Sequence, residues 1–172
     1  MDECLFCQIV AGKVPSNKVF EDKDILAFLD INPRNPGHTL VIPKKHIETV
    51  MDMSDAEFGK IVKTVKDVVN AVKVGTSADG ISIGQSNGKA AGQVIPHVHF
   101  HVIPRFNNEG PVGLEGILPV KRMDEESLKK MTETVKNSFG KKAEKREEPV
   151  VEEDLGDIKE DDFADLDFED EL

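Results

Sequence analysis

The clearest pattern in the chain is a strict alternation of apolar and polar residues near its middle, VIPHVHFHVIPR at positions 94–105. Successive side chains of a strand point to opposite faces of a sheet. The pattern therefore predicts a strand over 94–103 with one apolar face that suits burial in the core. The opposite face would carry His97, His99 and His101, three of the five histidines in the chain. An alternation this regular indicates a functional site.

A single metal ion does not account for the three histidines. At a rise of about 3.3 Å per residue, His97 and His101 would lie roughly 13 Å apart along the strand. Zn–N bonds are only about 2.0–2.1 Å long, so the three imidazoles must have different roles. The plainer alternatives are a metal pair of the His-x-His kind and a solvated strand face, and the residues alone leave both open.

The remaining apolar residues predict four further strands and three helices. Short apolar runs bounded by turn residues indicate strands at 18–21, 25–29, 38–43 and 81–85. Apolar residues spaced by three and four indicate helices at 4–11, at 55–74 and after Asp124. Ser54 and Glu57 have the spacing of a capping box at the start of the long helix. The order predicts an α+β fold, an antiparallel sheet with its helices gathered on one side.

Acidic residues concentrate at the C-terminal end. The chain has 172 residues and a net charge of −11, yet segment 147–172 alone holds 14 acidic residues against Lys159, a net of −13. We expect a folded domain at 1–140 and a disordered acidic tail at 141–172, because like charges repel and few apolar residues offset the lost chain entropy. A docking motif for a protein partner is the alternative to a solubilising tail, since the tail contains Phe163, Leu166 and Phe168.

Composition and charge exclude several functional classes. Residues 1–146 carry a net charge of only +2, which offers no basic stripe, so we expect no nucleic-acid partner. The chain has no run of 18 apolar residues and no positively charged leader, so we expect a cytoplasmic protein with no membrane partner. Cys4 and Cys7 are too few for a disulfide scaffold, and a Cys-x-x-Cys pair in a cytosolic chain indicates zinc or redox chemistry.

Two blocks of the sequence resemble one family. HVHFHVI matches the signature of the histidine triad (HIT) superfamily of nucleotide hydrolases and transferases. The stretch FCQIVAGKVPSNKVFEDKDILAFLDINPRNPGHTLVIPKKH is similar to the family's N-terminal pattern, so that the resemblance covers about residues 4–106. It implies a HIT-like domain with a five-stranded antiparallel sheet, paired into a homodimer with a joined sheet.

The chemistry of imidazole suggests how three histidines would be used. A neutral imidazole, with a pKa of about 6.5, is a good nucleophile at pH 7 and can attack phosphorus to form a covalent intermediate. The middle histidine, His99, is flanked by two others that can hold the phosphate, and the family resemblance implies the same nucleophile. The resemblance also implies that His101 is the proton donor or hydrogen-bond partner of the leaving group and that His38 is a fourth active-site histidine.

The resemblance further implies a nucleotide pocket. Asp30 matches the acid that accepts both ribose hydroxyls, a pairing that suits a carboxylate. Asn87 and Gln93 match polar residues that contact the phosphate. The base would be surrounded by five apolar residues, namely Leu5, Phe6, Ile9, Phe28 and Ile31. From the residues alone, plain core packing is the preferred interpretation of Phe6, Phe28 and Ile31.

The Cys-x-x-Cys pair matches the zinc-containing members of the superfamily. By that resemblance the ligands are Cys4, Cys7, His46 and His97. Four protein ligands leave no open position for water, so a Zn²⁺ ion there would be structural. The resemblance implies no cofactor for the chemistry itself.

These features together predict a hydrolase that cleaves adenosine (purine) nucleotide conjugates at the α-phosphorus through a nucleotidyl-His99 intermediate. The leaving group stays open between phosphoramidates and dinucleoside polyphosphates. Val94 stands where the phosphoramidase branch carries a serine, whereas Pro104 and Arg105 resemble the dinucleotide-hydrolase branch. Two alternatives remain: a nucleotidyltransferase or phosphorylase of the same superfamily, and a non-catalytic nucleotide-binding protein that acts through its acidic tail.

Overall fold

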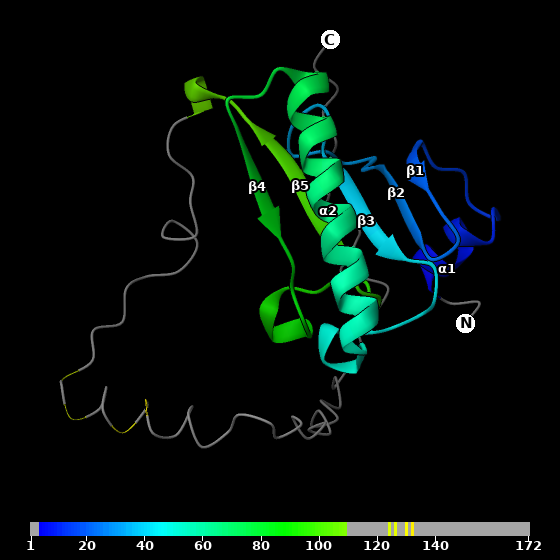
Figure 1. The fold of residues 1–172 in the computed structure, drawn as a ribbon, viewed down its shortest axis with the longest axis vertical. Coiled ribbons are helices and arrows are strands. Elements are labelled where there is room, and N and C mark those ends of the chain that lie inside the picture. The colour runs from blue at the N-terminus through cyan, green and yellow to red at the C-terminus, as the bar shows by residue number, and fades with distance from the viewer. Residues whose placement is uncertain (1–3, 110–123, 125, 127–129, 131, 133–172) are drawn as a thin grey trace, which may run out of the picture. The chain divides into compact units, whose positions relative to one another are not determined.

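The computed structural model describes residues 4–109 together with residues 124, 126, 130 and 132 (Figure 1). The helix expected after Asp124 falls mostly on residues outside this set. The domain boundary at 140 and the acidic tail lie wholly outside it, so both stay predictions. Among the described residues, no helix has the length and apolar character needed to cross a membrane.

The described part is built on a five-stranded antiparallel sheet, as the sequence predicted (Figure 1). The strands lie in the order β1-β2-β3-β5-β4. Their bounds are β1 Lys18–Glu21, β2 Ile25–Leu29, β3 Thr39–Pro43, β4 Gly80–Gly84 and β5 Phe100–Arg105. In the register of β3 and β5, Leu40 lies opposite His101, which brings two segments far apart in sequence side by side.

Helix α2 (Asp55–Thr76) covers one face of the sheet and crosses in front of β3 and β5 in Figure 1. The predicted capping box is present, since Ser54 and Glu57 exchange side-chain and backbone hydrogen bonds. The buried side of the helix packs on alternate strand residues, and this core cluster includes Ile61, Val65, Val68, Val41, Val98, Phe100 and Val102. The apolar face predicted for the histidine segment is therefore the face beneath α2.

Helix α1 (Leu5–Val10) lies on the other face of the sheet, so the prediction that the helices gather on one side was wrong. Residues of β2 alternate between the two sides: Ala27 belongs to the core under α2, whereas Phe28 packs with Phe6 and Ile9 of α1. Strands β2 and β3 are thus buried on both faces, and their continuous apolar runs already reflect this.

Strand β5 begins at Phe100, six residues later than the 94–103 strand that the alternation predicted. The backbone before it pairs elsewhere, because the Val98 N–H donates to the Ile47 carbonyl at 2.7 Å and Pro96 has no N–H. The alternation itself survives this correction. His97 and His99 precede the strand, yet their side chains still lie on the face opposite Val98 and Phe100.

Candidate active site and metal centre

A cavity of about 390 Å³ opens on the face of the sheet that carries α1. It brings together residues from the first helix, the end of β2 and the histidine segment. Eight predicted site residues line it: Leu5, Phe6, Ile9, Phe28, Asp30, Ile31, His99 and His101. Phe6 and Phe28 meet edge to face with their ring centroids 5.8 Å apart, and this apolar end of the cavity can hold a flat ring.

His99 is held in one tautomer. Its Nδ1 lies 2.7 Å from the carbonyl oxygen of His97. A carbonyl only accepts hydrogen bonds, so the neutral ring carries its proton on Nδ1 and its lone pair on Nε2. The ring is 7% exposed and sits against Phe6, with the centroids 5.3 Å apart. This arrangement leaves an unprotonated nitrogen at the cavity, which is what a nucleophile requires.

His38 and His101 form a hydrogen-bonded pair whose direction can be deduced. The backbone N–H of Arg34 donates to His38 Nδ1 at 3.2 Å, so a neutral His38 carries its proton on Nε2. That Nε2 lies 2.9 Å from His101 Nδ1 and donates to it. His101 Nδ1 is therefore an acceptor, and its own proton is on Nε2. His101 thus lines the cavity as a hydrogen-bond donor.

Burial keeps both imidazoles of this pair neutral near pH 7. It lowers the pKa of His38, although the carboxylate of Asp30, 3.4 Å from Nδ1, acts in the opposite direction. Burial, followed by the neighbouring His99 and His38, lowers the pKa of His101 to about 4. Asp30, His38 and His101 lie close enough together to suggest a metal site. However, both nitrogens of His38 already have hydrogen-bond partners, so we interpret the group as a hydrogen-bonded chain that fixes the tautomer of His101.

Asn87 and Gln93 are not brought into this cavity. The amide of Gln93 accepts from the Gly88 N–H at 2.6 Å and donates to the Glu48 carbonyl at 2.7 Å. Asn87 accepts from the Val50 N–H at 2.9 Å. Both amides are therefore engaged in holding the loop before the histidine segment, and their contact with phosphate stays a prediction.

Ten further residues line the cavity without having been predicted as site residues, and three of them matter for its chemistry. Ser16 and Arg34 line the cavity, and so does Val94, whose side chain is 89% exposed. Ser16 Oγ is the one buried side-chain polar atom without a hydrogen-bond partner among the described residues. No pattern singled out Ser16. Arg34 follows Asp30 by four residues and precedes His38 by four, a position between two predicted site residues that could have drawn attention to it.

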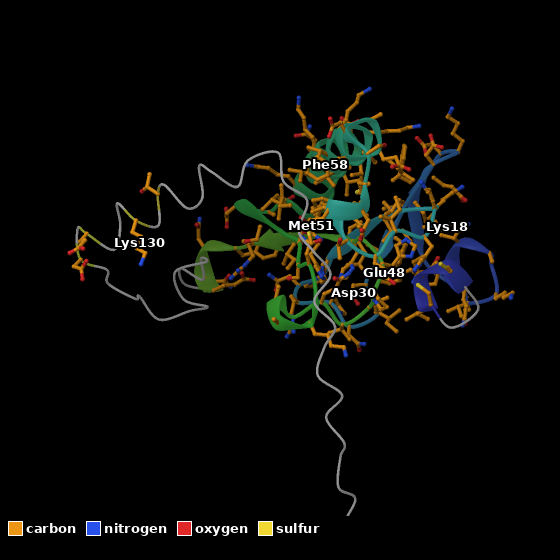
Figure 2. All side chains as sticks on the ribbon, turned by 90° about the horizontal axis from the view of Figure 1, so that it is seen from below. Lys18, Asp30, Glu48, Met51, Phe58 and Lys130 are labelled. Atoms are coloured by element: carbon orange, nitrogen blue, oxygen red, sulfur yellow. The ribbon has the colours of Figure 1, made fainter. Side chains whose placement is uncertain are left out.

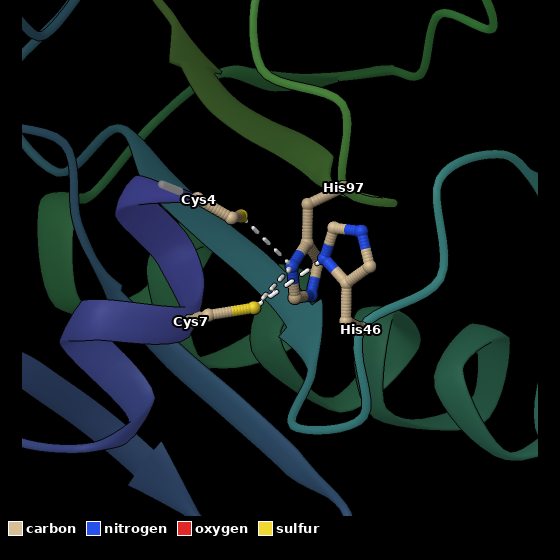
Figure 3. A group of neighbouring side chains, drawn as sticks. All are labelled: Cys4, Cys7, His46 and His97. Carbon is tan, nitrogen blue, oxygen red and sulfur yellow. Dashed lines mark hydrogen bonds between the residues drawn. The ribbon is translucent and has the colours of Figure 1, made fainter. Parts of the chain in front are cut away.

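The four predicted metal ligands converge next to this cavity (Figure 3). Cys4 precedes α1, Cys7 lies within it, His46 follows β3 and His97 precedes β5. Their ligand atoms all lie within 4.8 Å of one another. Cys4 Sγ lies 3.5 Å from His97 Nδ1, and Cys7 Sγ lies 3.7 Å from the same nitrogen and 3.3 Å from His46 Nδ1.

These distances fit a tetrahedral zinc ion. Bonds of about 2.3 Å to sulfur and about 2.05 Å to nitrogen would place the S and N ligand atoms about 3.6 Å apart. His97 Nε2 donates to the Pro43 carbonyl at 2.8 Å, which leaves the Nδ1 lone pair facing the two thiols. Burial, and then the neighbouring Cys4, raise the pKa of the Cys7 thiol, so a bound cation must displace its proton.

Comparison with known proteins assigns this chain to a family. Residues 11–108 match the family model described as the HIT domain. The chain is 48% identical over 129 residues to an uncharacterized HIT-like protein from Methanocaldococcus jannaschii, an alignment that covers 74% of this chain and 98% of that protein. It is 41% identical over 111 residues to a Schizosaccharomyces pombe protein named adenosine 5′-monophosphoramidase, with 64% of this chain and 80% of the relative covered.

The fold agrees with a solved structure. A histidine triad nucleotide-binding protein from Candida albicans superposes with a TM-score of 0.68 at 33% sequence identity, over 79% of this chain and 96% of that one. The matched family range includes all five histidines and the aspartate discussed above, from Asp30 to His101. The resemblance inferred from HVHFHVI is thereby confirmed, and the chain belongs to the HIT family.

Proposed function

We propose that this protein hydrolyses adenosine (purine) nucleotide conjugates at the α-phosphorus through a covalent nucleotidyl-histidine intermediate on His99. The observation that carries the proposal is the 2.7 Å contact between His99 Nδ1 and the His97 carbonyl, which in the neutral ring leaves the Nε2 lone pair at the cavity. The family relationship supports nucleotide hydrolysis, since the S. pombe relative is named as a monophosphoramidase.

The nucleotide would lie along the cavity from its apolar to its polar end. The purine packs among Phe6, Ile9 and Phe28, while Leu5 and the exposed Ile31 flank it from the mouth. Asp30 accepts the ribose hydroxyls through the carboxylate oxygen that does not bind the Asn32 N–H. This placement brings the α-phosphorus to His99.

The reaction then proceeds in two steps. His99 Nε2 attacks phosphorus, and the bond to the leaving group breaks. The leaving atom keeps the electron pair, accepts a hydrogen bond from the His101 Nε2–H and, where its basicity requires one, takes a proton from water. Water next attacks the phosphoramidate, whose P–N bond breaks and returns neutral His99. The proton that this water releases passes to solvent and balances the one that the leaving group takes up, and the nucleoside monophosphate leaves. His38, which donates to His101 Nδ1 at 2.9 Å, holds that ring in the donor tautomer throughout.

We also propose that Cys4, Cys7, His46 and His97 hold one structural Zn²⁺ ion. The donor set and the S–N distances described above support it. Zinc binding would join α1 to the histidine segment. Because His97 supplies both a ligand nitrogen and the carbonyl that orients His99, the ion would stiffen the nucleophile without entering the reaction.

We also propose that the protein forms a homodimer in which the sheets of the two copies join. Strand β4 forms an edge of the sheet, and its Ile83 side chain is 56% exposed. Ile83 pairs with Val102 of the core beneath α2. The exposed Phe58 (Figure 2) and Val62 lie on α2 itself. A second copy that paired along β4 would cover this unprotected edge and its apolar side chains.

The test is incubation of the purified protein with adenosine 5′-phosphoramidate and with diadenosine polyphosphates. Release of AMP, followed by chromatography, would support the proposed hydrolase. The control is His101→Ala, which removes the proposed hydrogen-bond donor to the leaving group and should slow the release of poor leaving groups most. Binding of AMP without turnover of either substrate class would instead identify a nucleotide-binding protein.

A further inference from the structure

Arg34 is a cation at the cavity that the proposed reaction does not yet use. It lines the same cavity as His99 and His101, and its side chain is exposed. Its guanidinium has no hydrogen bond or ion pair among the described residues. By contrast, Arg105 is held by Glu109 at 2.7 Å and Lys44 by Glu21 at the same distance. The positive charge of Arg34 is therefore available to a ligand.

The backbone that carries Arg34 is fixed against the catalytic pair. The Arg34 N–H donates to His38 Nδ1, and the carbonyl of the next residue, Asn35, accepts from the His38 N–H at 2.9 Å. The Asn35 side chain donates to the Pro104 carbonyl at 2.7 Å and to Glu109 at 2.6 Å. These bonds tie the turn to the end of β5. The guanidinium is thus attached to a well-anchored segment beside His38.

The positive charge of Arg34 lies near the hydrogen-bonded pair of His38 and His101. Its charge contributes to lowering the pKa of both His38 and His101, the two residues of the donor pair. The other end of the cavity is apolar and is lined by Phe6, Ile9 and Phe28. A cation near the His101 N–H, the proposed hydrogen-bond donor to the leaving group, faces the side from which that group departs.

We propose that Arg34 is a specificity-determining residue that binds negative charge on the leaving group. The inference rests on the proposed hydrolase and narrows its substrates to nucleotide conjugates whose leaving group is an oxyanion, either a phosphate chain or a sulfate. When the P–O bond breaks, its oxygen keeps the electron pair while the His99 Nε2–P bond forms. The guanidinium offsets the charge that this oxygen gains.

The rim of the cavity agrees with this assignment. Val94, which is largely exposed there, offers neither a donor nor a charge to a leaving group. His101 supplies a single N–H. Arg34 offers up to five N–H donors in a planar arrangement that matches phosphate and sulfate oxygens. An anionic leaving group therefore gains far more from this site than a neutral amine does.

The experiment compares wild type, Arg34→Gln and the control Lys66→Gln. The control removes the same charge from an exposed position of α2, on the opposite face of the sheet. The rate of AMP release is measured as kcat/KM for diadenosine tetraphosphate, adenosine 5′-phosphosulfate and adenosine 5′-phosphoramidate, whose leaving amine is neutral. Calorimetry gives the affinity of each protein for AMP and for the non-hydrolysable α,β-methylene-ADP.

We expect Arg34→Gln to lower kcat/KM by about tenfold for the anionic leaving groups and by less than about twofold for the phosphoramidate. The affinity for α,β-methylene-ADP should fall by a similar factor while that for AMP is retained. A loss confined to the sulfate or to the polyphosphate substrate would identify which oxyanion is bound.

Equal losses for all three substrates, or no loss for any, would overturn the assignment of Arg34. If wild type releases no AMP from any substrate, the proposed hydrolase fails. In that case the ratio of α,β-methylene-ADP to AMP affinity still decides the role of Arg34, because binding needs no turnover.

Discussion

At the scale of single residues, His97 connects the two centres of this molecule. Its ring presents Nδ1 to Cys4 and Cys7, while its backbone carbonyl holds the Nδ1 proton of His99. A residue two positions away thereby decides which nitrogen of the proposed nucleophile carries a lone pair. The close spacing of the triad has a direct chemical consequence, because a carbonyl two residues earlier in the chain lies within reach of the ring.

The lowered pKa of His101 predicts a pH dependence of stability. The folded ring takes up a proton only at about pH 4, whereas in the unfolded chain it does so at its ordinary value of 6.5. Between these values the unfolded state binds more protons, so stability should decrease as the pH falls from 6.5 towards 4. Urea unfolding at pH 7 and pH 5 measures this. His101→Asn should flatten the dependence, and an unchanged slope would show that this ring is not its source.

Ser16 allows a second prediction at this scale. Its buried hydroxyl lacks a partner among the described residues, so Ser16→Ala should raise the free energy of unfolding by about 1 kcal/mol. Ser54→Ala is the matched control, because that hydroxyl accepts from the Glu57 N–H in the helix cap. The control should lose about 1 kcal/mol. Denaturant titration distinguishes the two, and a loss in both variants would mean that Ser16 has a partner in solution.

At the scale of elements, the stability of α1 depends on its contacts with the rest of the protein. It has six residues and no side-chain cap, too few for a helix to be stable on its own. Phe6 and Ile9 hold it to the sheet, and the ligand cluster holds its first turn. Whether the element is well ordered should therefore depend on the proposed zinc ion.

We predict that the purified protein carries one zinc ion per chain and that Cys4→Ser loses it. Loss of the ion should lower the melting temperature and the rate of AMP release, because α1 and the His97 carbonyl are no longer held together. Elemental analysis measures the zinc content, thermal unfolding gives the melting temperature, and chromatography gives the rate of AMP release. Treatment of wild type with a chelator should reproduce the variant, whereas the variant itself should not respond. A metal-free wild type with full activity and heat stability would rule out the structural ion.

The sequence predicted most elements because their signals are local. The capping box located the start of α2, and the apolar runs located β1, β2 and β3 to within a residue. The start predicted for β5 was wrong because the Val98 N–H bonds to the Ile47 carbonyl instead of to a neighbouring strand. This contact joins residues far apart in the sequence, so no local pattern predicts it. The residues of α1 show that it has an apolar side, but they do not show which face of the sheet that side packs against.

The candidate site was predicted to a similar extent. Residues in the two matched blocks, such as Asp30, His38 and His99, were found through the family resemblance, and the structure brings them together. Arg34 and Ser16 were missed because an exposed arginine and a loop serine have no distinctive spacing. Only the cavity and the hydrogen-bond pattern give them a role.

At the scale of the whole molecule, the open edge of the sheet predicts self-association. Ile83→Lys places a charge on the exposed apolar residue of β4 and should convert a dimer to a monomer. Light scattering coupled to size exclusion gives the molar mass directly. Val19→Lys is the matched control, because it adds the same charge on β1, at the other edge of the sheet. Dimers in both variants would place the interface elsewhere.

The central claim is that His99 carries the nucleotidyl group, and acid or base quenching during turnover tests it most directly. With a substrate labelled in the α-phosphate, wild type should yield a labelled adduct on His99 that survives base and is lost in acid, as a phosphoramidate is. His99→Gly should form no adduct and lose turnover while it still binds AMP. If the variant kept turnover within tenfold of wild type, about 1.4 kcal/mol of activation free energy, His99 would not be the nucleophile.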